Sequence, residues 1–295
     1  MKKLSLFSIL ALIMVPFMLA GCADKETDTN TAVETTPKPM VAVSIVPEET
    51  FVKAVCGDMA DVVVMVPPGS SPGNYEPTPK EMEQFSNAQL YFSIGVPTEE
   101  ANIMPKATEI EGMKIVSLQD AVSQVYPDRE IAPGERDPHI WLSPKRAIVM
   151  VQAIAGEMAE IDPANKAQYD ENAQAYIEQL EDLDGEIQTA LEGVQNKKFI
   201  VFHPAFGYLA DDYGLQMYAL EEDGKEATPQ SLQDMIDLAK QENIKAIFYQ
   251  AEISSTQAEA FAEEIGGKTV QLAPLAANYI ENLKNMAEVM SEVMQ

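Results

Sequence analysis

Histidine, cysteine, tryptophan and positive charge are all scarce in this chain. Its 295 residues include two histidines, two cysteines and one tryptophan, and 20 lysines and arginines stand against 47 aspartates and glutamates, for a formal net charge of −27. Because such a surface repels phosphate backbones, nucleic-acid binding is not expected. Two cysteines allow one disulfide at most. The acidic surface could concentrate cations near the protein, or it could serve solubility alone.

The first 21 residues are typical of a secretory signal. Two lysines precede an apolar run over 4–20, which is too short and wrongly flanked for a membrane span. The run ends in Leu19-Ala20-Gly21-Cys22, which resembles the lipobox of bacterial lipoproteins. That resemblance implies cleavage after residue 21 and a lipid anchor on Cys22, outside the cytoplasmic membrane. An unrelated cysteine after a signal peptide is the alternative.

The segment 22–39 is predicted to be a flexible tether. It is polar, acidic, rich in threonine and closed by prolines, so it cannot bury enough apolar surface to offset its ordering entropy. If Cys22 carries a lipid, Cys56 has no intramolecular disulfide partner. Its place in an apolar run predicts a small core residue.

From residue 40 onward, apolar runs of strand length alternate with helical patterns. This alternation predicts an α/β fold with mostly parallel sheets covered on both faces. Strands are expected over 40–46, 61–66, 89–94, 114–117, 198–202, 216–220, 244–249 and 269–272, and a loop over 126–137. Two similar lobes follow, over 40–161 and 195–295.

The linking segment 162–194 is predicted to be one long amphipathic helix. A single apolar stripe recurs at steps of three and four residues, and about 30 residues would span about 45 Å. A helix crossing both lobes is preferred over one with a coiled-coil partner. The stripe consists of Tyr169, Ala173, Tyr176, Leu180, Leu183, Ile187 and Leu191.

Both histidines lie beside a proline and close to the end of a predicted element. His139 falls in Asp137-Pro138-His139-Ile140-Trp141-Leu142-Ser143-Pro144, and His203 in His203-Pro204-Ala205-Phe206-Gly207-Tyr208, directly after a strand. Imidazole is the commonest metal-ligating side chain near neutral pH, and ligands of α/β folds lie beyond the carboxyl ends of the strands. The pattern therefore indicates a metal site. Two partly buried histidines with ordinary hydrogen bonds are the alternative.

These motifs, together with Tyr75-Glu76-Pro77-Thr78-Pro79 and Pro274-Leu275, resemble the cluster A-I solute-binding lipoproteins of zinc and manganese ABC importers. The resemblance covers nearly everything from residue 40 onward. It implies two lobes joined by a rigid helix, a metal cleft between them, and delivery to a membrane permease driven by a separate ATPase. It also implies an extracytoplasmic, lipid-anchored protein, which we expect to be a monomer.

The family's typical metal site has four ligands, of which this chain keeps two. His139 and His203 match the second and third positions, whereas Gly73 and Ala273 stand at the first and the fourth. Zinc favours four donors, so a carboxylate or water must complete the set. Glu252, just past a strand of the second lobe, is the preferred third ligand, with a solvated surface acid as the alternative reading. Asn74 and Glu76 are weaker candidates.

The leading functional hypothesis is an extracytoplasmic receptor that captures a divalent transition metal for import. Zinc is preferred, and more oxygen donors would favour manganese or iron. The substitutions at Gly73 and Ala273 leave open a receptor for a metal chelate or a non-metal solute. A metallohydrolase is a further hypothesis, since two histidines, an acid and an open position could activate water. The chain has no metalloprotease or GxSxG signature, and no enzyme is expected. Cell adhesion is the last.

Overall fold

The computed structural model describes residues 37–221, 225–253 and 256–295. Residues 38–295 form one compact unit that holds both large sheets and three hydrophobic clusters. The predicted signal peptide, Cys22 and nearly all of the predicted tether lie outside the described residues. In the described ranges, no helix combines the length and the apolar character needed to cross a membrane.

The first lobe is built on a parallel four-stranded sheet with the strand order β2-β1-β3-β4. All four residues of β3 are buried, as expected for a central parallel strand covered on both faces. The strands are β1 (Met40–Val43), β2 (Asp61–Val64), β3 (Leu90–Ser93) and β4 (Lys114–Ser117). The helices are α1 (Val46–Cys56), α2 (Pro79–Phe85), α3 (Met104–Ala107), α4 (Leu118–Ser123) and α5 (Pro144–Ile161).

The second lobe repeats this architecture with the strand order β10-β9-β7-β8, again all parallel. Its strands are β7 (Lys198–Val201), β8 (Gln216–Ala219), β9 (Ala246–Gln250) and β10 (Lys268–Leu272). Its helices are α7 (Gly207–Asp212), α8 (Pro229–Gln241), α9 (Thr256–Glu264) and α10 (Tyr279–Val293). The predicted fold class, two α/β lobes with parallel sheets, is confirmed.

Several helices begin where the sequence places a hydroxyl before a proline. Thr78, Ser143 and Thr228 are the N-caps of α2, α5 and α8, and each side chain accepts a hydrogen bond from the backbone N–H three residues later. The proline that follows each cap fills the first helical position, where no N–H partner is needed. These starts are therefore fixed by local chemistry.

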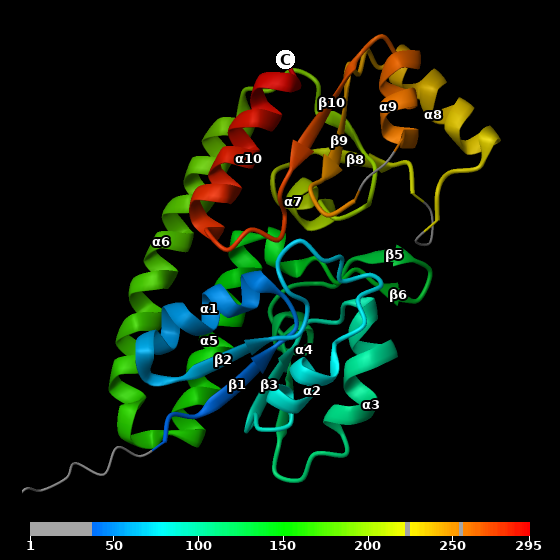
Figure 1. Cartoon of the computed structure of the whole chain (residues 1–295). Helices are drawn as coiled ribbons and strands as arrows, with labels where there is room; N and C mark the ends of the chain where they lie inside the picture. Colours follow the sequence, from blue (N-terminus) through cyan, green and yellow to red (C-terminus); the bar gives the residue numbers. More distant parts are fainter. Residues whose placement is uncertain (1–36, 222–224, 254–255) are drawn as a thin grey trace, which may run out of the picture. The chain divides into compact units, whose positions relative to one another are not determined.

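Helix α6 (Lys166–Glu192) joins the two lobes. Its 27 residues span about 40 Å, and it packs against α1 and α5 of the first lobe and α10 of the second (Figure 1). The prediction of a helix that crosses both lobes is confirmed. The buried stripe differs from the expected one at a single step, because Ile177 is buried and Tyr176 only partly so.

One local prediction is wrong, and one helix was not predicted. The loop expected over 126–137 contains an antiparallel hairpin, β5 (Glu130–Ala132) and β6 (Glu135–Arg136), which turns at Gly134 with a φ of 82°. Helix α4 was not expected at all. It has only six residues, too few to show a helical period, and the capping of its first turn by the Ser117 side chain identifies its start.

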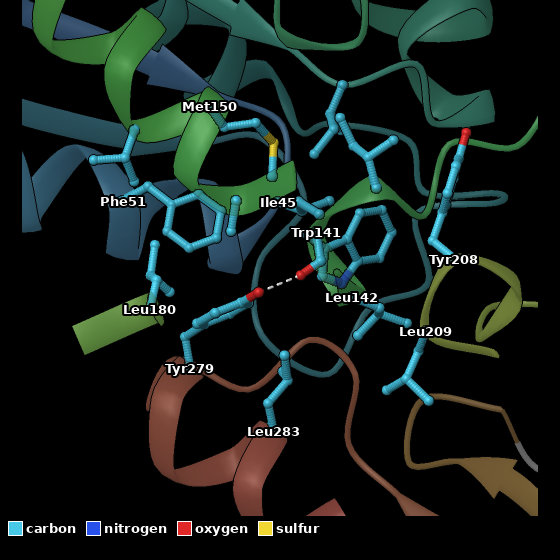
Figure 2. Close-up of a cluster of buried hydrophobic side chains, with 14 of the residues drawn as sticks. Ile45, Phe51, Trp141, Leu142, Met150, Leu180, Tyr208, Leu209, Tyr279 and Leu283 are labelled. Atoms are coloured by element: carbon cyan, nitrogen blue, oxygen red, sulfur yellow. Dashed lines mark hydrogen bonds between the residues drawn. The ribbon is translucent and has the colours of Figure 1, made fainter. Parts of the chain in front are cut away.

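The segment that follows His139 is tied to the second lobe. The Trp141 indole N–H donates to the carbonyl of Pro274 at 2.9 Å. The Tyr279 hydroxyl donates to the Trp141 carbonyl at 2.5 Å (Figure 2). Trp141 and Tyr279 are each 2% exposed, and the Tyr279 ring meets Phe51 edge-on with centroids 4.8 Å apart. One buried cluster therefore contains parts of both lobes.

Two buried acids lie beyond the carboxyl ends of β1 and β3. Glu48 Oε2 accepts from the backbone N–H groups of Ser44 and Ile45, and Glu99 accepts from two backbone N–H groups after β3. Burial raises the pKa of both carboxyls, and the charge of Glu99 raises that of Glu48 further. Glu48 Oε1 is buried without a hydrogen-bonding partner among the described residues, which fits a neutral Glu48 carboxyl.

Candidate metal site

His139 is placed by a short buried turn between β6 and α5. Asp137 Oδ1 accepts a hydrogen bond from the backbone N–H of His139 at 2.9 Å, and Pro138 separates the two residues. A 3-10 turn over Ile140–Leu142 follows, and all three of its side chains are buried. The turn is therefore held by core packing, and the imidazole has little freedom to move away.

His203 is placed by the second sheet. It follows β7 after one residue, at the edge of the sheet where the carboxyl ends of the parallel strands meet. The neighbouring strand β8 ends two residues before Glu221. This register brings the Glu221 carboxylate to the His203 ring, with Oε2 3.0 Å from Nδ1.

The two imidazoles meet through their Nε2 atoms, which are 3.3 Å apart. Each Nδ1 faces a carboxylate: Asp137 Oδ1 lies 2.7 Å from that of His139, and Glu221 Oε2 lies 3.0 Å from that of His203. The side chains of His139 and His203 are 10% and 25% exposed. The pair is thus nearly enclosed and supported on both sides by acids.

This arrangement brings the Nε2 atoms of the two rings face to face. A carboxylate that accepts a hydrogen bond from Nδ1–H favours the tautomer in which Nε2 carries no hydrogen and its lone pair can bind a metal ion. Burial lowers the pKa of His139, which favours its neutral, metal-binding form. Two zinc–nitrogen bonds of about 2.05 Å at a tetrahedral angle separate the nitrogens by about 3.3 Å. The observed Nε2–Nε2 distance, 3.3 Å, fits that geometry.

The structure does not bring a third predicted ligand to this pair. Among the described residues, no group of three or more histidine, cysteine, aspartate or glutamate side chains could hold a metal ion. Glu252 is half-buried, and burial raises its pKa. Its Oε2 is enclosed and has no hydrogen-bonding partner in the ranges that the structure describes. Asn74 and Glu76 are exposed. The role of Glu252 as a ligand stays a prediction.

Sequence reasoning missed the two acids that orient the histidines. Asp137 was visible, since it lies two residues before His139 in the same motif. Glu221 lies 18 residues after His203, and only the pairing of β7 with β8 places it beside the ring. A search for acids after each strand of the same parallel sheet would have found it.

Two α/β lobes joined by one long helix, with a histidine from each lobe meeting between them, define a two-lobed binding protein. The family model described as "Zinc-uptake complex component A periplasmic" matches residues 41–293. The chain belongs to this family, which contains the solute-binding components of metal ABC importers.

Relatives and solved structures agree with this assignment. The chain is 30% identical to the high-affinity zinc uptake system protein ZnuA of Bacillus subtilis (strain 168), over 91% of this chain and 88% of that protein. It is also 30% identical to the iron ABC transporter substrate-binding lipoprotein MtsA of Streptococcus pyogenes serotype M6, over 90% and 87%. A crystal structure of ZnuA superposes with a TM-score of 0.82 at 35% identity, covering 88% of this chain and 100% of that one.

Proposed function

We propose that this protein captures a divalent transition metal ion between His139 and His203 and delivers it to an ABC permease. The observation that carries the proposal is the approach of the two Nε2 atoms to 3.3 Å. Without a shared cation or proton, two lone pairs at that distance repel each other. With a cation between them, both are satisfied, and the Asp137 and Glu221 carboxylates offset its charge.

Zinc is the cargo we propose first. Its tetrahedral geometry accounts for the nitrogen separation, and one relative is named as a zinc uptake protein. Another is named as an iron transporter lipoprotein, so manganese and iron are the competitors to test. Since Gly73 and Ala273 cannot act as side-chain ligands, water or Glu252 completes the coordination.

The place of action we propose is outside the cytoplasmic membrane. The lipobox-like segment before Cys22 supports a lipid anchor, and relatives are named as lipoproteins. A monomer tethered in this way can reach a permease in the same membrane, where a separate ATPase drives import.

A zinc titration of residues 38–295 tests the proposal, because this compact unit contains the whole site. Trp141 is the single tryptophan, and its ring centroid lies 5.1 Å from that of His139, so its fluorescence reports binding. Free zinc at 100 times Kd adds about 2.7 kcal/mol to the free energy of unfolding and raises Tm by about 5–10 °C.

Four variants complete the test. His139→Ala and His203→Ala should each weaken zinc binding by more than the roughly 10–100-fold typical of losing an outer-shell partner. Glu252→Gln weakens it only if this acid is a ligand, and Glu263→Gln, at an exposed acid of the same lobe, serves as the control. Unchanged Tm with zinc, or histidine variants that bind like the parent, would refute the proposal. Competition experiments with manganese and iron then show which of the three metal ions binds most tightly.

A further inference from the structure

The guanidinium of Arg129 lies between the buried Asp137 carboxylate and helix α7. Its Nε is 3.3 Å from Asp137 Oδ2, and its Nη1 is 2.9 Å from Asp211 Oδ2. Arg129 Nε and Asp137 Oδ2 are both buried, and neither has a hydrogen-bonding partner within the described ranges. The charge on Asp137 Oδ2 is therefore balanced by the ion pair with Arg129, while Asp137 Oδ1 is hydrogen-bonded to the backbone and ring of His139.

Helix α7 is shaped to receive this guanidinium. A Cβ atom on Gly207, its first residue, would lie inside van der Waals distance of Arg129 Nε, Cδ and Cζ. The hydroxyl of the next residue, Tyr208, accepts a hydrogen bond from the backbone N–H of Arg129 at 3.0 Å and donates one to the backbone carbonyl of Asp137 at 3.1 Å. Tyr208 of the second lobe thus binds the backbone on both sides of the β5–β6 hairpin, at Arg129 before β5 and at Asp137 after β6.

We infer that Arg129 is a positioning residue that couples contact between the lobes to the orientation of His139. The inference rests on the proposed function. Arg129 holds the Asp137 carboxylate so that Oδ1 faces the His139 Nδ1, and its own position depends on Asp211 and Gly207 of the other lobe. When the lobes meet at this point, the His139 Nε2 is presented to the cargo.

Loss of the guanidinium would leave Asp137 Oδ2 as a buried charge without a counterpart, which is strongly unfavourable. The carboxylate would then turn toward other donors, and the His139 ring would lose its fixed tautomer. Lysine cannot replace arginine fully, because its single ammonium cannot reach two carboxylates in a planar fork.

The two-histidine composition permits a direct test. Long-range proton–nitrogen NMR spectra of metal-free residues 38–295 should contain the ring signals of two histidines. The signals that disappear in His203→Asn belong to His203, and those that remain belong to His139. Arg129→Gln should move the His139 ring signals away from the Nδ1–H tautomer and weaken zinc binding by about tenfold. Arg129→Lys should give an intermediate result. Gly207→Ala, which displaces the guanidinium without removing it, should act like Arg129→Gln.

Arg136→Gln is the matched control. Arg136 belongs to the same hairpin but pairs with Asp120 and Asp128, so the variant removes the same charge and should leave the His139 signals and zinc affinity unchanged. His139 signals that are unaltered in Arg129→Gln, or altered equally in Arg136→Gln, overturn the inference; if Arg129→Gln fails to fold, Arg129→Lys and Gly207→Ala decide it by the same signals. Because the spectra are recorded without metal, failure of the parent to bind zinc would overturn the proposed function and leave this readout intact.

Discussion

Removal of one hydroxyl group at the contact between the lobes should measurably destabilise the protein. Tyr279→Phe deletes the donor to the Trp141 carbonyl, a 2.5 Å hydrogen bond at a site where both residues are 2% exposed. The edge-on packing against Phe51 is kept, so the change isolates the hydrogen bond. Leaving a buried carbonyl unpaired costs about 1–3 kcal/mol.

The body over 38–295 is large, so each kcal/mol lowers Tm by about 2–4 °C. Tyr279→Phe should therefore lower Tm by about 2–12 °C if the cost is about 1–3 kcal/mol. Urea unfolding followed by circular dichroism and by Trp141 fluorescence gives the free energy, and an unchanged m-value shows that the unfolded state is not altered.

Tyr218→Phe is the matched control for this measurement. Tyr218 is a partly buried residue of β8, and no hydrogen bond of its hydroxyl is found in the described part of the chain. Its loss should change the free energy of unfolding by less than about 0.5 kcal/mol. If the two variants are equally stable, the hydrogen bond between Tyr279 and Trp141 does not hold the lobes together.

Three further predictions concern the first lobe. Because the pKa of Glu48 is raised, the folded chain binds more protons than the unfolded chain above about pH 4.5, the ordinary glutamate value. The free energy of unfolding should therefore fall as pH rises above that value. Glu48→Gln should make this fall less steep in urea titrations between pH 4.5 and 8, and a profile parallel to that of the parent would contradict the raised pKa of Glu48. Burial raises the pKa of the Cys56 thiol to about 12, so thiol reagents at pH 8 should react with Cys56 only when urea unfolds the chain. Gly95→Ala should lower the urea midpoint strongly, since φ is +84° and a Cβ would overlap a neighbouring glutamine, whereas Gly156→Ala, in open space within α5, should raise the free energy of unfolding by about 0.5–1 kcal/mol.

The features that the sequence predicted well are those encoded locally. Apolar runs, hydroxyl-proline caps and the stripe of α6 depend on residues within a few positions of one another, and the strands and most helices lie where these patterns place them. The short helix α4 and the β5–β6 hairpin were missed, because six residues and five strand residues are too few to establish a period.

The candidate metal site was predictable in part for the same reason. His139 and His203 were identified from their motifs, and the structure brings their Nε2 atoms together. The supporting groups Glu221 and Arg129 are set by strand pairing and by contacts between lobes, at separations of 18 residues to His203 and 82 residues to Asp211. No local pattern contains that information, so only the folded structure reveals it.

The apolar stripe of α6 has a mechanical consequence. Since the same helix face supplies core residues to both lobes, wide separation of the lobes would strip α1 or α10 from it and expose those side chains to water. Rotation about a few backbone angles in a flexible linker would avoid that cost, but the segment that joins the lobes is the helix α6. Relative displacements of the lobes that keep this packing are therefore limited to small ones about α6.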